Sequence, residues 1–140
     1  MSVKQLSVFM ENKPGRLNKL TAALGKEGID LVTLSIADTK EYGIVRFIAR
    51  DNQKAYEILK KEGFAIERTE LIGIEVPDRP NALADVIGLL ETADINIEYL
   101  YSFVVTAIDT AKILFKVSDT DAAVKLLTAK GIKLLDEKIL

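Results

Sequence analysis

Hydrophobic and polar positions change their period several times along the first half of the chain. Apolar residues run together or alternate through short segments, and they recur at helical spacing from Leu17 to Leu24. The pattern therefore predicts two helices, one over Leu17–Leu24 and one over Gln53–Glu62. It predicts four strands, at Val3–Met10, Leu31–Ala37, Gly43–Ala49 and Phe64–Thr69. This half of the chain thus has the order βαββαβ.

The predicted first helix is flanked by residues typical of helix ends. Asn12 is suited to capping its start and Pro14 to its first turn, while Gly25 and Gly28 are suited to ending it. The second and third strands are joined across Asp38–Tyr42, which predicts a hairpin. A short loop is therefore expected between the first strand and the first helix.

The second half of the chain repeats the first. The segment Glu11–Leu17 reappears as Pro77–Leu83, with 66 residues between matching positions. Farther along, Phe47 is matched by Phe115 at an offset of 68, so the second copy holds two extra residues. A period this long is too large for a solenoid repeat and indicates duplication of a whole folding unit. We call residues 1–70 copy one and residues 71–140 copy two.

The second copy is predicted to repeat the six elements of the first. A βαββαβ order with right-handed crossovers gives a four-stranded antiparallel sheet with both helices on one face. We therefore expect an α+β protein made of two ferredoxin-like units. Units of about 70 residues bury little apolar surface alone, so we expect packing between copies or with a second chain. The predicted elements of copy two are Leu71–Val76, Leu83–Glu91, Ile97–Val105, Ala111–Val117, Asp121–Ala129 and Ile132–Leu140.

Composition restricts the chemistry that the chain can perform. The sequence contains neither His nor Cys, which removes thiolate ligands, the commonest metal ligand and the usual general base, so no metal or cofactor is expected. No apolar stretch approaches the roughly 18 residues of a membrane helix, and Met1–Met10 has no signal-peptide core. We expect a cytoplasmic protein without a membrane partner. A pI near 5.3 offers no basic surface for nucleic acid.

The loop between the first strand and the first helix has the chemistry to bind a small zwitterion. Backbone N–H groups at a helix start lack partners and attract anions, and Gly15 allows close approach to the main chain. Asn12 adds amide donors and an acceptor, and Asp30 offers an acceptor for an ammonium group. The same residues also fit a purely structural role, with Asn12 as a helix cap and Asp30 as a turn former. The pattern alone leaves both interpretations open.

The sequence Glu-Asn-Lys-Pro-Gly-Arg-Leu at residues 11–17, with Gly-Ile-Asp-Leu at residues 28–31, resembles the ACT domain. ACT domains are βαββαβ regulatory modules that bind amino acids and other small effectors, and the resemblance covers nearly the whole chain as two units. In serine-regulated phosphoglycerate dehydrogenases, paired ACT domains hold the effector through two polar residues, whose roles fall on Asn12 and Asp30. The His that this family often places before the loop is Met10 here, which favours a more apolar effector.

The resemblance implies ligand-binding roles at matching positions of both copies. The loop backbone would supply donors, and the two polar positions would contact the effector. Copy two departs further from the family pattern, with Asn81 in place of the loop glycine. The candidate residues are Asn12, Lys13, Pro14, Gly15, Arg16, Leu17 and Asp30 in copy one, and Asp78, Arg79, Pro80, Asn81, Ala82, Leu83 and Asn96 in copy two.

The resemblance implies a regulatory protein rather than an enzyme, because the two ACT units leave no residues for a catalytic domain. We expect a homodimer that senses an amino acid, either free-standing or as the regulatory partner of a separate metabolic enzyme. The effector would bridge two ACT surfaces and stabilise one arrangement of them.

Three alternatives share the fold order. Acylphosphatases place an Arg and an Asn around a phosphate loop. The residues of these types in the two loops are Arg16, Arg79, Asn12 and Asn81, but the glycine-rich cradle is missing. RNA recognition motifs stack bases on paired sheet aromatics, a signature that Phe47 and Phe115 do not form. A structural module without a ligand is the third alternative.

Overall fold

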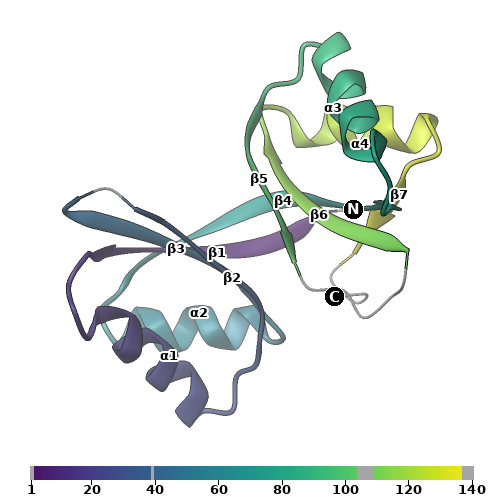
Figure 1. Cartoon of the computed structure of the whole chain (residues 1–140). Coiled ribbons are helices and arrows are strands. Elements are labelled where there is room, and N and C mark those ends of the chain that lie inside the picture. Colours follow the sequence, from purple (N-terminus) through teal and green to yellow (C-terminus); the bar gives the residue numbers. More distant parts are fainter. Residues whose placement is uncertain (1, 39, 104–108, 137–140) are drawn as a thin grey trace. The chain divides into compact units, whose positions relative to one another are not determined.

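The computed structural model describes residues 2–38, 40–103 and 109–136 (Figure 1). The described chain divides into two compact units. One unit consists of Lys4–Thr69, and the other takes the remaining described residues. Each unit is described by itself below.

The first unit has six elements around one sheet. The strand order is β2-β3-β1-β4, and β3 pairs antiparallel with both β1 and β2. Helices α1 and α2 cover the same face of this sheet (Figure 1). The elements are β1 (Val3–Glu11), α1 (Arg16–Lys26), β2 (Leu31–Asp38), β3 (Tyr42–Ala49), α2 (Asn52–Lys61) and the first part of β4 (Ala65–Pro77).

The second unit repeats this plan. Its strand order is β5-β6-β4-β7, with β6 antiparallel to both β4 and β5. Helices α3 and α4 lie on one face of the sheet (Figure 1). The predicted α+β class with two ferredoxin-like units is confirmed. The remaining elements are α3 (Ala82–Thr92), β5 (Ile97–Phe103), β6 (Thr110–Val117), α4 (Thr120–Ala129) and β7 (Lys133–Leu135).

Each unit closes its own hydrophobic core between the sheet and the two helices. In the first unit the helical stripes predicted from the sequence face Phe47 of β3, and these core side chains are at most 1% exposed. The second core uses the matching positions around Phe115. The helix residues concerned are Leu20, Leu24, Ala55 and Leu59 in copy one and Val86, Leu90, Ala123 and Leu127 in copy two.

The internal repeat extends to individual backbone hydrogen bonds. The Asn12 N–H donates to the Glu41 carbonyl at 2.9 Å, and the matching Asp78 N–H donates to the Asp109 carbonyl at 2.8 Å. The donors lie 66 residues apart and the acceptors 68, as the sequence offsets require. Equivalent positions in the two copies can therefore be compared residue by residue.

The four helices in the described part of the chain end in the same way. Each is closed by a residue with positive φ, and the following N–H groups bond back to carbonyls of the last turn, as in the Schellman motif. For α1 this residue is Gly28, with φ of 70°, which confirms the predicted stop. Gly25 lies inside α1 and does not end it. The other closing residues are Gly63, Asp94 and Gly131.

The start of α1 differs from the sequence expectation. Its N-cap is Gly15, in the left-handed conformation with φ of 89°, and the helix begins at Arg16. The predicted capping role of Asn12 and first-turn role of Pro14 are therefore wrong. The reason is that the left-handed turn at Gly15 redirects the chain, which leaves both residues in the preceding loop. Helix α3 begins in the same way at Asn81, with φ of 71°.

Some strand boundaries also differ from the prediction. The segments predicted as separate strands on either side of Glu70 form one continuous strand, β4, because no turn residue interrupts them. Strand β5 is described as far as Phe103, and the predicted continuation through residues 104–105 lies outside the described residues. Strand β7 is shorter than predicted and ends at Leu135, and residues 137–140 lie outside the described part. Among the described residues, no helix has the length and apolar character required to cross a membrane.

Candidate ligand-binding site

The loop between β1 and α1 presents its main chain to solvent. Strand β1 ends at Glu11, and Asn12 to Gly15 are exposed. The positive φ of Gly15 is a conformation that side-chain-bearing residues rarely adopt, although a Cβ there would meet no atom within 4 Å. Glycine is therefore favoured by the backbone conformation, and the space above it stays open to a ligand.

The four helix starts are of two kinds. Helices α2 and α4 are capped by Asp51 and Asp119, whose carboxylates each accept a backbone N–H at 3.0 Å. Helices α1 and α3 begin at Gly15 and Asn81 without any side-chain cap. The Arg16 and Ala82 N–H groups donate to the carbonyls of Lys13 and Arg79 at 3.3 Å, so the N–H groups that follow them in the first turns are the ones that can bind an anion. These are the two helix starts that the ACT resemblance assigns to ligand binding.

The two basic side chains beside the first loop, Lys13 and Arg16, lie at different distances from the Glu11 carboxylate. The Lys13 ammonium lies 2.8 Å from the Glu11 carboxylate, and this hydrogen bond and charge, with the more distant Arg16, lower the pKa of Glu11. Arg16 lies 3.8 Å from Glu11, beyond hydrogen-bonding distance. The Arg16 guanidinium can therefore still donate to another acceptor.

Asp30 lies at the opposite end of α1 from the loop. Helix α1 has 11 residues, which at 1.5 Å per residue separate its ends by about 16 Å. The Asp30 carboxylate is 75% exposed and lies 3.7 Å from the Arg50 guanidinium. Asn12 and Asp30 of one unit therefore do not converge on one small molecule. A ligand that contacts both positions must take the second from another copy of the unit.

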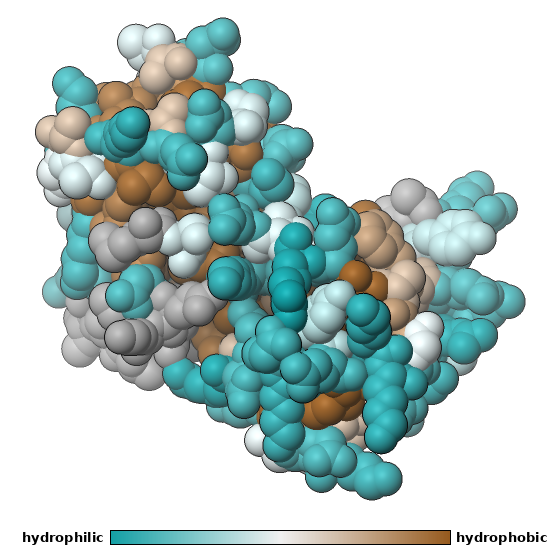
Figure 2. Space-filling view, turned by 180° about the vertical axis from the view of Figure 1, so that it is seen from behind, coloured by the Kyte–Doolittle hydropathy of each residue, from teal (hydrophilic) through white to brown (hydrophobic). Residues whose placement is uncertain are grey.

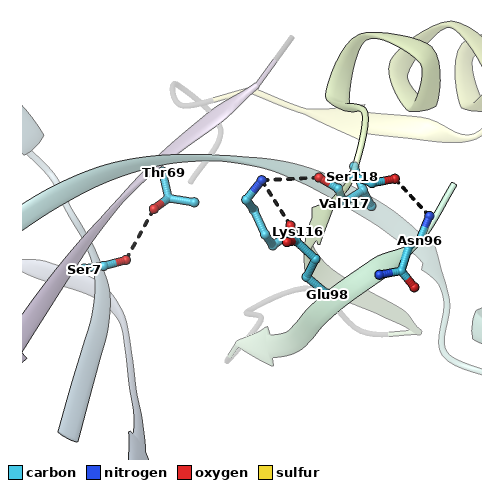
Figure 3. A network of polar contacts seen from close by, with 7 residues as sticks. All are labelled: Ser7, Thr69, Asn96, Glu98, Lys116, Val117 and Ser118. Carbon is cyan, nitrogen blue, oxygen red and sulfur yellow. Dashed lines mark hydrogen bonds and ion pairs between the residues drawn. The ribbon is translucent and has the colours of Figure 1, made fainter. Parts of the chain in front are cut away.

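The corresponding residues of copy two keep the backbone arrangement but use their side chains differently. The Arg79 guanidinium donates to the carbonyl of Pro80 at 3.2 Å, so it folds onto its own loop. The Asn96 N–H donates to the Ser118 hydroxyl at 3.0 Å, while its side-chain amide points away from Ser118 (Figure 3). Asp78 is exposed at the position that matches Asn12.

Three candidate side chains belong to the hydrophobic cores instead. Leu17 and Leu83 pack against the cores of their own units, and Ala82 is only 6% exposed. Ala82 can reach a ligand only through its main chain, whereas Leu17 and Leu83 are half-buried.

A cavity of about 370 Å³ opens beside the first loop within copy one. It lies between the end of β1, the first half of α1, the start of β3 and the turn from α2 to β4. Ligand pockets usually measure about 300 to 1,000 Å³ and carry a few polar groups on a largely apolar wall. The lining residues are Phe9, Met10, Glu11, Arg16, Lys19, Tyr42, Glu62, Gly63, Phe64 and Ala65.

Apolar side chains reach the surface in patches between charged ones (Figure 2). Among the described residues, the large exposed hydrophobic side chains include Phe9 and Tyr42, which line the cavity. Leu34 and Ile36, exposed by 47% and 49%, lie on the edge strand β2. Copy one therefore carries apolar surface both at the cavity and along its sheet edge.

Only one residue that the sequence assigned to ligand binding, Arg16, lines this cavity. Sequence reasoning named Met10 only as a departure from the family pattern and missed the remaining lining residues, because the lining comes from four separate segments. A signal was nevertheless present in the repeat. Lys19 and Glu62 are matched in copy two by Asp85 and Lys130, so both positions reverse their charge.

A sequence model of the family described as ACT domain pair matches residues 1–140. The chain belongs to this family. The ACT pair is 42% identical to protein BT0572 from Bacteroides thetaiotaomicron, whose crystal structure it matches with a TM-score of 0.91 over 96% of this chain and 92% of that one. No curated protein matches the sequence.

Two more distant structures share the fold of the ACT pair. They are the regulatory subunits of aspartate kinase from Thermus thermophilus, in the ligand-free form, and from Thermus flavus. Each is 16% identical to this chain, with TM-scores of 0.62 and 0.61. The matches cover 90% of this chain and 91% and 90% of the two subunits. Membership of the ACT family supports a regulatory role in which a small molecule is bound.

Proposed function

We propose that this ACT pair senses an amino acid and transmits its binding to a metabolic enzyme, as a free-standing sensor or a regulatory partner. The observation that carries the proposal is the uncapped start of α1 at Gly15. The main chain there is exposed and no side chain caps it, whereas α2 and α4 each have one N–H bound by an aspartate. An effector carboxylate fits this helix start, and the Asn12 amide would supply a further donor.

The second half of the proposed site comes from another ACT domain. Because Asn12 and Asp30 lie at opposite ends of α1, the effector ammonium would reach Asp30 of a second domain. We therefore propose a homodimer in which the effector bridges two ACT surfaces. The effector would stabilise the arrangement that it binds better, which is the requirement for an allosteric signal.

The test is a screen of the twenty amino acids and small 2-oxo acids for a rise in melting temperature. A ligand that binds only the folded protein stabilises it by mass action, by about 2.7 kcal/mol at a hundredfold excess over Kd. We expect a selective rise that is abolished by Asn12→Ala and by Asp30→Ala. Asn18→Ala, on the exposed surface of α1, is the matched control and should retain the rise. Absence of any rise, or a rise that survives both site variants, would contradict the proposed site.

The proposed assembly is tested separately by light scattering. One chain has a mass of 15.5 kDa, and we expect a particle of twice this mass. The edge strand β2 exposes Leu34 and Ile36, so Ile36→Lys should shift the protein toward the mass of one chain. The matched control is Lys54→Met on α2. A single-chain mass for the unmodified protein, with and without the effector, would contradict the dimer.

A further inference from the structure

The charges that line the cavity of copy one have no counterparts in copy two. At the matching positions of copy two, Arg16 is replaced by the buried Ala82. Lys19 is replaced by Asp85, and the two positions are structurally equivalent because both N–H groups donate to the N-cap carbonyl of their helix. One cation is therefore lost and the other is reversed.

The wall of the cavity has also changed between the copies. Copy one has Phe9 and Ala65 at two lining positions. Copy two has Glu75 and Lys133 there, paired across β4 and β7 with their charged atoms 2.6 Å apart. An ion pair thus stands in copy two where copy one offers an apolar wall.

The copy-one cavity combines a cationic end with an apolar wall. Arg16 and Lys19 are three residues apart on α1, so they share one side of its first turns. Lys19 also lies over the ring of Phe64, with its ammonium 5.4 Å from the ring centroid. A carboxylate is the group that these cations and the positive helix end would bind. Met10 and Phe64 supply surface for a large apolar side chain.

We propose that this cavity selects a small carboxylic acid with a large apolar side chain, and that each chain holds one such site, in copy one alone. The proposal rests on the proposed effector-binding function and adds the ligand class and the number of sites. In this cavity Glu62, the C-cap residue of α2, would accept the ammonium group of an amino acid in place of Asp30 of a second domain. An amino acid and its 2-oxo acid share the carboxylate and the side chain, so Glu62 distinguishes the two.

The test is isothermal titration of the full chain with L-leucine, L-phenylalanine and 4-methyl-2-oxopentanoate. L-serine lacks the apolar side chain and 3-methylbutylamine lacks the carboxylate, so neither should bind measurably. We expect one site per chain for the apolar acids. Tighter binding of leucine than of its 2-oxo acid, with the preference lost in Glu62→Gln, would identify an amino acid as the ligand. Equal or tighter binding of the 2-oxo acid would identify that class instead, within the same proposal.

Two variants transfer copy-two residues into the cavity of copy one. Arg16→Ala and Lys19→Asp each remove a charged partner of the carboxylate, and each should weaken binding by about tenfold or more. Asp85→Lys changes the charge at the matching position of α3 in copy two and should leave affinity unchanged. The melting temperature of each variant without ligand shows whether it is folded. If Lys19→Asp does not fold, Lys19→Met replaces it in the affinity measurement.

Three outcomes would overturn this proposal alone. They are two equivalent sites per chain, affinity unchanged in folded Arg16→Ala and Lys19→Asp, and binding of polar amino acids such as serine alone. The last result would leave the proposed function intact, because a serine signal lost in Asn12→Ala still marks the loop as an effector site. Failure of every amino acid and 2-oxo acid to bind would overturn both proposals.

Discussion

Asp94 occupies a backbone conformation in which the other three helices have glycine. Its φ of 58° lies in the left-handed region, which costs a residue with a Cβ about 1 kcal/mol. We expect Asp94→Gly to raise the free energy of unfolding by about 0.5 to 1 kcal/mol. For a domain of this size, 1 kcal/mol shifts the melting temperature by roughly 4 to 8 °C.

The reciprocal change is available at the matching helix end of α4. Gly131 has φ of 75°, so Gly131→Asp should lower the melting temperature by a similar amount. Calorimetry of the two variants measures both effects. If Asp94→Gly lowers the midpoint, the Asp94 side chain makes a stabilising contribution that outweighs its backbone strain.

Glu75 should make stability depend on pH. Its hydrogen bond to Lys133 lowers the pKa of the Glu75 carboxyl, whereas burial raises it, and the net shift is downward from 4.5. The pKa in the folded protein is therefore below that in the unfolded chain. The resulting stabilisation is present above the unfolded value and is lost as pH falls through the folded value.

We expect Glu75→Gln to be less stable than the unmodified protein at pH 7, with a smaller difference at pH 3. Urea unfolding at the two pH values measures this. In a Lys133→Met background the same substitution should have a smaller effect at pH 7, which assigns the effect to the pair. A difference that is equal at both pH values would contradict the assignment.

The two kinds of helix start should respond differently to substitution. Asp51 and Asp119 cap α2 and α4, so Asp51→Ala and Asp119→Ala should each cost about 0.5 to 2 kcal/mol of unfolding free energy. Asn12→Ala and Asp78→Ala remove no cap and should cost much less. Denaturant titration compares the four variants. A large decrease in the unfolding free energy of Asn12→Ala would show that this side chain stabilises the fold, contrary to its exposed position in the loop.

The periodic parts of the fold follow from the sequence, whereas the helix starts do not. Alternation around Phe47 and the stripe of Leu20 and Leu24 identify the core, because the positions that face it are fixed by the pleat and the helical turn. The Asn-Lys-Pro-Gly segment instead has the composition of a capped start. Only the positive φ at Gly15 shows that Asn12 stands outside the helix.

The cavity is the part of the site that sequence spacing reveals least. Its lining comes from positions as distant as Phe9 and Ala65, which the sheet and helices bring together. Arg16 lay within a motif, but Lys19 and Glu62 resemble ordinary solvent-exposed charges on a helix. Comparing the two copies position by position is the sequence test that distinguishes them. The roles assigned to Asn12 and Asp30 remain predictions.

At the scale of the whole chain, the two cores have no residue in common. Leu59→Ala and Leu127→Ala each remove a buried side chain from one core and should cost about 2 to 5 kcal/mol. Hydrogen exchange should show which core has lost stability, and Leu59→Ala should increase exchange mainly in residues 4–69. Leu127→Ala should do so mainly in residues 70–136. Equal acceleration along the whole chain in both variants would mean that the cores unfold as one.

Strand β4 has an evolutionary consequence. It runs unbroken from Ala65 to Pro77 and serves both sheets, so no spacer separates the duplicated halves. One residue inserted after Thr69 would turn the rest of the strand over, because successive side chains point to opposite faces. The junction between the two halves therefore does not tolerate the insertion or deletion of single residues. At this junction, divergence after the duplication is therefore confined to exchanges of side chains in place, and the two extra residues of copy two lie elsewhere in the chain.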